Sequence, residues 1–155
     1  MKKLLTIFTS LFVTIICFLF SGCQKYPETL CPCGKIEISK KEYIAMCISP
    51  EEVTENSTNI LRMENYTKKN MLYDNSFFEY FNGNDWNPIP LDLIAIELIL
   101  YQLPAGKVGE SKANFYYLLT EHANDAKNGK YRFTQSVTLS GFGKYNLVTE
   151  FEFIK

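Results

Sequence analysis

Hydrophobic and polar positions follow two different patterns along this chain. A mostly apolar run extends from Leu4 to Phe20, whereas from residue 36 onward apolar and polar residues mostly alternate. Alternation at every second position is typical of strands with one buried face, because successive side chains in a strand point to opposite sides of the sheet. The pattern therefore divides the chain into an apolar leader and a body of predicted β-strands.

The alternating segments are short and are separated by turn residues. Two predicted strands cover residues 43–48 and 59–65, and a hairpin follows in which the aromatic run 77–81 passes through Asn82-Gly83 to Trp86. An Asn-Gly pair between hydrophobic runs is a strong hairpin signal, because the favoured two-residue turns need positive φ. Further strands are expected at residues 112–119, 130–139 and 145–153.

Side chains of the last two segments indicate which face is buried. We expect the core to receive Tyr131, Phe133, Leu147, Phe151 and Phe153, while Gln135 interrupts the alternation. Residues 91–103 are almost uniformly apolar, so their periodicity does not distinguish a buried strand from a buried helix. The neighbouring strands favour a strand there. Short strands at roughly ten-residue spacing predict an all-β antiparallel sandwich of about seven strands.

The leader has the features of an export signal. Lys2 and Lys3 precede the apolar run, and the small residues Ser21 and Gly22 follow it. This order of basic, apolar and small residues is typical of a secretory signal peptide. Cys23 comes next and offers a thiol for acylation. The alternative is an uncleaved membrane anchor, and both interpretations place the rest of the chain outside the cytoplasm.

The end of the leader, Phe20-Ser21-Gly22-Cys23, resembles the lipobox of bacterial lipoproteins, with Phe20 where Leu is usual. The resemblance implies that the mature chain begins at Cys23 and carries several acyl chains, palmitate among them, since one chain binds a membrane only marginally. Gln24 in place of Asp implies the outer membrane if the host is Gram-negative. The expected organisation is a lipoprotein signal peptide over 1–22, a tether over 23–35 and one domain over 36–155.

Charge and size limit the functions of the mature chain. Removal of residues 1–22 takes away Lys2 and Lys3 but no acidic residue, so 133 residues remain with 14 basic and 17 acidic side chains and a net charge of −3. This length is enough for one domain with its own core. No basic cluster of the kind that binds phosphates is present, so we expect no nucleic-acid partner.

Three further cysteines remain in the body of the chain, and export permits disulfides. Cys31 and Cys33 flank Pro32 and are poorly placed to bond each other. We therefore expect one of them to pair with Cys47 and the other to stay free, and the spacing leaves open which. A zinc site built from these three and His122 lacks the second cysteine pair that such sites usually have, so we expect no metal and no cofactor.

Catalytic motifs are missing from the sequence. His122 is the only histidine and stands in a polar, turn-rich segment. No serine has the Gly-x-Ser-x-Gly context of a hydrolase, and Gly141-Phe142-Gly143-Lys144 lacks the spacing of a phosphate-binding loop. We therefore expect no catalytic residues and a protein that is not an enzyme.

Several segments, read in order, resemble the small immunoglobulin-like domains of bacterial lipoproteins. They are residues 61–65 leading to the aromatic hairpin 77–86, then 103–107, then 129–133, closed by 147–154. The resemblance implies an immunoglobulin-like sandwich over about residues 43–155. It also gives Tyr131 the place of a tyrosine corner, whose hydroxyl bonds backbone upstream. No cysteine lies in 130–139, so the inter-sheet disulfide of antibody domains is absent.

Domains of this kind bind, adhere or act as spacers, and the fold alone does not decide among these roles. We expect a non-catalytic lipoprotein of the cell envelope, held to the membrane by lipid on Cys23, with an envelope protein or a glycan as its partner. Because exposed aromatic side chains anchor interfaces, the expected binding surface consists of Phe77, Tyr80, Phe81 and Trp86. The alternative is an exported enzyme or thiol-active protein that uses Cys31 or Cys33.

Overall fold

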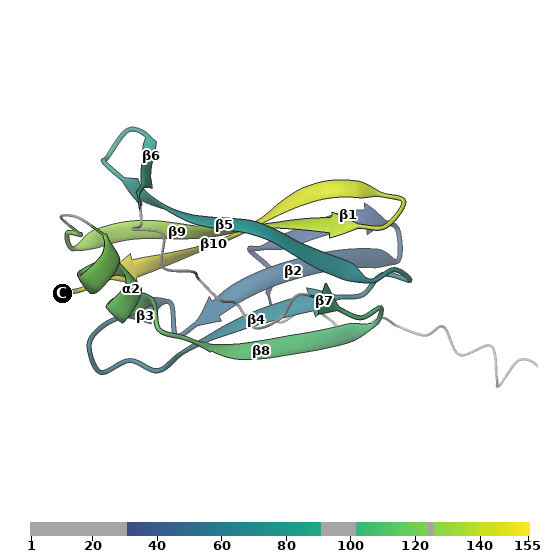
Figure 1. The fold of residues 1–155 in the computed structure, drawn as a ribbon, viewed down its shortest axis with the longest axis horizontal. Coiled ribbons are helices and arrows are strands. Elements are labelled where there is room, and N and C mark those ends of the chain that lie inside the picture. The colour runs from purple at the N-terminus through teal and green to yellow at the C-terminus, as the bar shows by residue number, and fades with distance from the viewer. Residues whose placement is uncertain (1–30, 91–101, 124–125) are drawn as a thin grey trace, which may run out of the picture.

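The computed structural model describes residues 31–90, 102–123 and 126–155. Two sheets pack face to face, and a short helix lies at one end (Figure 1). The leader, Cys23 and the beginning of the expected tether lie outside the described residues, as do residues 91–101. Within the described ranges, no helix has both the length and the apolar character needed to cross a membrane.

The smaller sheet, sheet A, has four antiparallel strands in the order β1-β2-β4-β8. Their bounds are β1 (Lys35–Ser39), β2 (Glu42–Ser49), β4 (Asn59–Asn65) and β8 (Lys107–Ala113). The strands predicted at 43–48 and 59–65 are therefore confirmed. The inner face of sheet A is apolar and carries Ile44, Met46, Ile48, Leu61 and Met63.

The larger sheet, sheet B, has the order β3-β10-β9-β5-β6, with β7 paired to β5. Its strands are β3 (Glu52–Val53), β5 (Met71–Phe81), β6 (Trp86–Ile89), β7 (Gln102–Leu103), β9 (Gly129–Leu139) and β10 (Gly143–Phe153). Every pairing in it is antiparallel except that of β3 with β10. The fold is an immunoglobulin-like β-sandwich, as the sequence predicted. The structure describes ten strands, against about seven predicted; β1 and the two-residue strand β3 were not predicted, and β7, also of two residues, is too short for a readable periodicity.

Aromatic rings fill the space between the sheets. Phe115 lies 4.9 Å from Phe78 and 5.0 Å from Phe133, measured between ring centroids, and all three side chains are buried. These separations are typical of favourable aromatic pairs. The five side chains predicted to point inward, namely Tyr131, Phe133, Leu147, Phe151 and Phe153, are all buried.

The prediction of a strand over residues 112–119 is wrong beyond Ala113. A helix, α2 (Phe115–His122), follows β8, and the Asn114 side chain caps it by accepting a bond from the backbone N–H of Tyr117 at 3.4 Å. Phe115 and Leu119, four residues apart, are buried on one face of α2. The aromatic content of this segment favoured a strand, but the cap and the four-residue spacing are helix signals.

The folded domain begins before residue 36. Cys31 is fully buried, and Gly34 accepts a backbone bond from Met46 at 3.3 Å. Residues 31–35, which the sequence placed in the tether, therefore lie against sheet A. Of the ambiguous segment 91–103, only residues 102 and 103 are described, and they form β7.

Gln135, which breaks the alternation of β9, has a structural explanation. Strand β5 shifts register between Tyr73 and Ser76, and Gln135 lies opposite Ser76 at the edge of this shift. The Gln135 side chain is buried, and its Nε2 donates to the backbone oxygen of Asp74 at 3.0 Å. A bulge leaves backbone groups without a ladder partner. The Gln135 amide supplies a hydrogen bond to one of them, the Asp74 carbonyl of the neighbouring strand.

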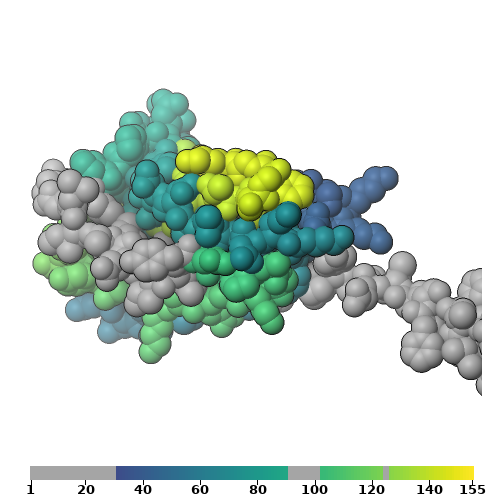
Figure 2. All heavy atoms as spheres, turned by 45° about the vertical axis from the view of Figure 1, so that its right-hand side comes forward, coloured from purple at the N-terminus to yellow at the C-terminus, as the bar shows by residue number. Residues whose placement is uncertain are grey.

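The hairpin of β5 and β6 projects from the sandwich. Figure 1 shows β6 rising at the end of the molecule where α2 and the C-terminus lie, and in the space-filling view the hairpin stands above the adjacent described surface (Figure 2). Its turn is closed by a bond from the Asn82 N–H to the Asp85 oxygen at 3.1 Å, and Gly83 has a φ of 101°. The predicted Asn-Gly hairpin is confirmed.

Candidate functional site

The outer face of sheet B carries a cluster of aromatic and charged side chains beside the projecting hairpin. We call Glu79, Phe81, Trp86 and Arg132 the Trp86 cluster. Cross-strand register places Phe81 opposite Trp86 and Glu79 opposite Arg132. The rings of Phe81 and Trp86 are 5.2 Å apart, and the Arg132 guanidinium carbon lies 4.6 Å from the centre of the Trp86 ring. Three strands therefore bring one cation and two aromatic rings together.

An ion pair holds the Arg132 side chain in this position. Both oxygens of the Glu79 carboxylate accept bonds from the guanidinium, one of them from Nη2 at 2.8 Å. The hydrogen bond to Glu79 raises the pKa of Arg132 above its usual value. A planar guanidinium held in a bidentate pair has little freedom left to lose on binding, so the cluster is organised before any partner arrives.

Phe77 extends the cluster along β5, and Tyr80 does not. Alternation places Phe77, Glu79 and Phe81 on the outer face, where 38 % of the Phe77 side chain is exposed. Tyr80 lies on the opposite face of the strand, with its ring 5.1 Å from that of Tyr131. Three of the four expected binding residues thus share one surface. Their role in binding stays a prediction.

Arg132 and Glu79 were missed as site residues when the sequence was read. Alternation along β5 places Glu79 on the same face as Phe77 and Phe81, and alternation along β9 places Arg132 on the outer face. The strand order, which makes β5 and β9 neighbours, is not visible in that alternation. A search for charged residues on the same face as exposed aromatics would have found Glu79 only.

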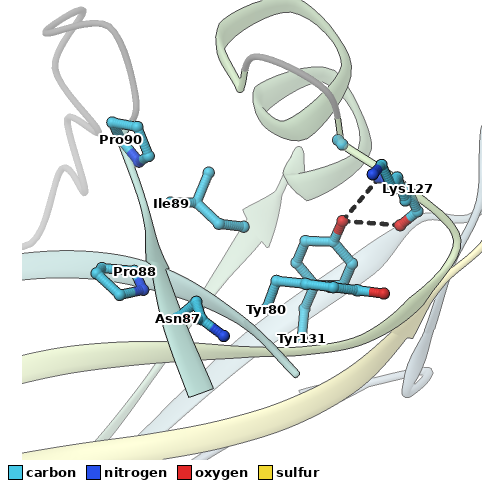
Figure 3. Close-up of a pocket in the computed structure, with 8 residues that line it drawn as sticks. Tyr80, Asn87, Pro88, Ile89, Pro90, Lys127 and Tyr131 are labelled. Atoms are coloured by element: carbon cyan, nitrogen blue, oxygen red, sulfur yellow. Dashed lines mark hydrogen bonds between the residues drawn. The ribbon is translucent and has the colours of Figure 1, made fainter. Parts of the chain in front are cut away.

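A small pocket lies on the inner side of the same hairpin, as Figure 3 shows. It is lined by Tyr80, Asn87, Pro88, Ile89, Pro90, Ala126, Lys127 and Tyr131. Its volume of about 220 Å³ is below the roughly 300–1,000 Å³ of typical ligand sites. We therefore do not assign it to a small-molecule ligand.

The pocket contains the predicted tyrosine corner, which is confirmed. The Tyr131 hydroxyl donates to the backbone oxygen of Lys127 at 2.7 Å and accepts from the Lys127 N–H at 3.0 Å (Figure 3). Burial raises the pKa of Tyr131, and the bond to the Lys127 backbone partly opposes this rise. The residue fastens the segment before β9 to the end of the core.

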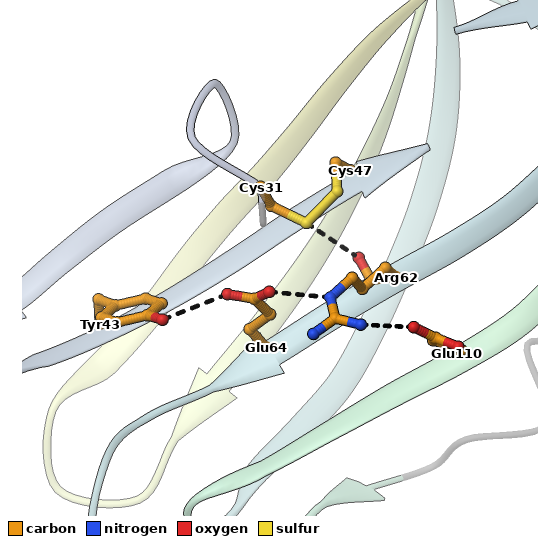
Figure 4. A network of polar contacts seen from close by, with 6 residues as sticks. All are labelled: Cys31, Tyr43, Cys47, Arg62, Glu64 and Glu110. Carbon is orange, nitrogen blue, oxygen red and sulfur yellow. Dashed lines mark hydrogen bonds and ion pairs between the residues drawn. A yellow bond between two sulfur atoms is a disulfide. The ribbon is translucent and has the colours of Figure 1, made fainter. Parts of the chain in front are cut away.

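The outer face of sheet A carries a second polar network, drawn in Figure 4. The Glu64 side chain is 1 % exposed, and its carboxylate accepts bonds from the Arg62 Nε at 2.8 Å and the Tyr43 hydroxyl at 3.3 Å. Arg62 also pairs with Glu110 on β8. The bond to Glu64 raises the pKa of Arg62. Because Glu64 is buried and paired, its carboxylate stabilises the fold and is withdrawn from the surface, while Arg62 and Glu110 remain partly exposed.

A disulfide joins the start of the described chain to the same face. Cys31 bonds Cys47 of β2, with the two Cα atoms 5.1 Å apart, and Cys33 is exposed and outside this bond. The bridge connects the N-terminal arm, residues 31–34, to one sheet and does not cross the core as the antibody disulfide does.

The residues considered for catalysis or metal binding do not come together. His122 lies in the last turn of α2, with its ring 5.5 Å from that of Tyr117, and not in a polar turn as the sequence suggested. In the part of the chain that the structure describes, no three His, Cys, Asp or Glu side chains are grouped so that they could hold a metal ion.

Comparison with known proteins adds the family. A model of the bacterial Ig-like domain matches residues 40–152, which is more than half of the chain. The match extends from the turn before β2 to the penultimate residue of β10. No curated protein and no solved structure matches the chain.

Proposed function

The chain belongs to the bacterial Ig-like domain family, and on that premise we propose that it is a lipoprotein of the cell envelope whose domain binds a protein partner without catalysis. Membership of this family supports a binding or structural role. The observation that carries the binding surface is the Trp86 cluster on a hairpin that projects from the sandwich.

The lipid anchor is supported by the leader and by the residues around Cys23. The test is to express the full chain, extract the membranes with detergent and measure the intact mass. We expect a species that begins at Cys23 and carries added acyl mass, and a Cys23→Ser chain that stays as unprocessed precursor. A mature chain that begins at Cys23 without acyl mass would overturn the anchor.

The residue types of the cluster favour a protein as the partner. Trp, Phe and Arg are enriched in protein interfaces, and Trp and Arg dominate their hot spots. The cluster presents all three types within one small area, with Phe77 beside them. A glycan is the other partner class considered, and the binding test separates the two.

Site-specific cross-linking tests this surface with a matched control. A photoreactive phenylalanine analogue is placed at Phe77, on the outer face of sheet B, or at Val108, on the outer face of sheet A. The two side chains have nearly equal exposure, 38 % and 36 %. We expect a protein adduct from position 77 in intact cells, its loss on Trp86→Ala, and none from position 108.

Equal adducts from both positions, or an adduct at 77 that Trp86→Ala leaves unchanged, would contradict the assigned surface. If the purified domain is retained on isolated cell-wall glycan and Trp86→Ala abolishes this retention, the partner of this surface is a glycan and not a protein.

The non-catalytic role has its own test. We expect no turnover from the purified chain in a panel of hydrolase and thiol-oxidoreductase assays. Turnover that His122→Ala abolishes would make the protein an enzyme. The thiol-active alternative meets one obstacle in the structure, since Cys31 is already bonded to Cys47 and is fully buried.

A further inference from the structure

If the pairing of β1 with β2 continued beyond Lys35, Cys33, and not Cys31, would lie opposite Cys47. Lys35 lies opposite Ala45, and Ile36 lies opposite Ile44. The bond from the Met46 N–H to the Gly34 oxygen continues this register by one pair beyond β1. One more pair along the same ladder would join Cys33 to Cys47.

The ladder also gives that pair the geometry of a disulfide. The bond that Gly34 accepts from the Met46 N–H has the phase of a hydrogen-bonded pair, so the next pair of an extended ladder would be a non-hydrogen-bonded one, in which Cα atoms are about 4.5 Å apart. Disulfides span Cα separations of about 4.4–6.8 Å. In a β1 extended to residue 33, alternation would put Cys33 on the same side as Lys35, which is the side on which Cys47 and Ala45 lie.

A turn diverts the chain in the structure. At Pro32, Cys33 and Gly34 the chain folds back, so that Cys31 takes the place beside Cys47. Only glycine fits at position 34 in this arrangement, because an added Cβ would lie 1.9 Å from the Met46 oxygen. Cys33 is left exposed, two residues after Cys31, although in an extended β1 it would be the residue in register with Cys47.

We propose that Cys33 is an alternative partner for Cys47 and that the domain exchanges one disulfide for the other. The Cys33 thiolate attacks the Cys47 sulfur, a Cys33–Cys47 bond forms, and the bond to Cys31 breaks. The electron pair of the broken bond leaves on Cys31, which takes up the proton that Cys33 lost. No oxidant or reductant is consumed, since the number of disulfides and thiols is unchanged.

The exchange changes what covers sheet A. Cys31 packs with Tyr43 and Ala45 in a small cluster on the outer face, and its Sγ lies 4.0 Å from the Arg62 oxygen. A bond at Cys33 extends β1 by two residues and releases Cys31 from this face. The point at which the N-terminal arm leaves the sheet moves with it, so the two disulfides define two arrangements of the arm on the domain.

Residue-resolved labelling of the thiols tests the exchange in the full chain purified in detergent. The non-reduced protein is incubated at neutral pH, free thiols are blocked with N-ethylmaleimide at intervals, and the disulfide is then reduced and alkylated with iodoacetamide. Fragmentation mass spectrometry locates each label. In Cys33→Ser no thiol is available for the attack, so that variant supplies the background label on Cys31.

We expect the maleimide label on Cys31 to rise to a plateau over minutes to hours, the time scale of uncatalysed disulfide rearrangement, with a matching loss from Cys33. Label on Cys31 that stays at the level of Cys33→Ser would overturn the proposal.

A second variant reads the alternative bond directly. In Cys31→Ser, treated with oxidised glutathione, we expect a Cys33–Cys47 disulfide in place of two free thiols. A chain that keeps the circular dichroism of the wild type, but in which Cys33 and Cys47 both remain open to alkylation, would also overturn it. If Cys31→Ser does not fold, the time course in the wild type decides alone.

Discussion

The outer faces of the two sheets carry the same kind of ion pair, but its carboxylate is more deeply buried on sheet A than on sheet B. On sheet A the Glu64 carboxylate that Arg62 holds is 1 % exposed, and the N-terminal arm is bonded beside it through Cys31. On sheet B the Arg132–Glu79 pair is 28 % and 12 % exposed and lies against Trp86. We call the surroundings of Glu64 the closed face and those of Trp86 the open face; away from Glu64 the outer side of sheet A is accessible too, since Val108 is 36 % exposed.

The physical reason is the environment of the charges. A buried charge that loses its partner is costly, because water no longer solvates it, whereas an ion pair near solvent contributes little. The pair on sheet A is therefore tied to stability. The pair on sheet B holds Arg132 against Trp86 and contributes less to stability, which agrees with the binding surface proposed above.

Removal of the disulfide should open the closed face with the largest loss of stability. Cys47→Ala eliminates every disulfide on sheet A, and a bridge that closes 16 residues contributes about 3 kcal/mol. We expect urea unfolding to show a loss of about this size. Cys33→Ala, which keeps the Cys31–Cys47 bond, should change stability by about 0.5 kcal/mol or less. Equal effects of the two variants would contradict the role of the arm.

The two glutamates compare the faces directly. Glu64→Gln should cost about 2–3 kcal/mol, because hydrogen bonds to buried charged groups are worth about 1.5–3 kcal/mol each. Glu79→Gln, on the open face, should cost about 1 kcal/mol. Urea unfolding at low salt and at about 1 M NaCl checks both. At about 1 M the Debye length is about 3 Å, and added salt should reduce the effect of Glu79→Gln more because buried pairs are screened less. A larger loss from Glu79→Gln would reverse the comparison.

Two tyrosines of sheet B show how the open sheet is held from its inner side. Tyr131→Phe removes the bonds to Lys127 and should cost about 1–2 kcal/mol. Tyr73→Phe is the matched control, because the Tyr73 hydroxyl is buried and has no hydrogen-bond partner among the described residues. That variant should be neutral or up to about 1 kcal/mol more stable. A costly Tyr73→Phe would show that its hydroxyl has a partner.

Tyr73 and Tyr131 also predict how the unfolding free energy changes at alkaline pH. Burial raises the pKa of Tyr73, and burial raises that of Tyr131, above the value of about 10 in an unfolded chain. Each group then contributes stability that is complete below pH of about 10 and is lost as pH rises toward the folded-state pKa. We expect Tyr73→Phe to flatten the fall of the unfolding free energy above pH of about 10. A slope equal to that of the wild type would contradict this.

Truncation on the open face should have the smallest effect on stability. Trp86→Ala removes a half-buried ring and a cation–π contact, and we expect a loss of about 1 kcal/mol or less. Its effect on the cross-link from position 77 should nevertheless be complete. A large loss of stability would place Trp86 with the closed face as a structural residue.

Alternation within strands was sufficient to predict which side chains of β9 and β10 point inward, because the period of two acts at every residue. The Asn82-Gly83 hairpin was also predictable, since it depends on a turn of a few residues, whereas the corner at Tyr131 was implied by the resemblance to immunoglobulin-like domains. The helix α2 was not predicted, because its aromatic residues favour strands until Asn114 and the spacing of Phe115 and Leu119 are considered together.

The sequence by itself determined the sandwich of short strands and its inward-facing residues, which follow from patterns local in the chain, and it predicts a leader that ends at Cys23. Only the tertiary structure decided that Arg132 meets Trp86, that Cys31 and not Cys33 bonds Cys47, and that Glu64 is buried. The first two contacts join residues that are 46 and 16 positions apart, and Glu64 is buried by segments distant in the sequence. These contacts depend on the strand order and on the path of the N-terminal arm. Neither can be read from the hydrophobic periodicity of the residues that come into contact.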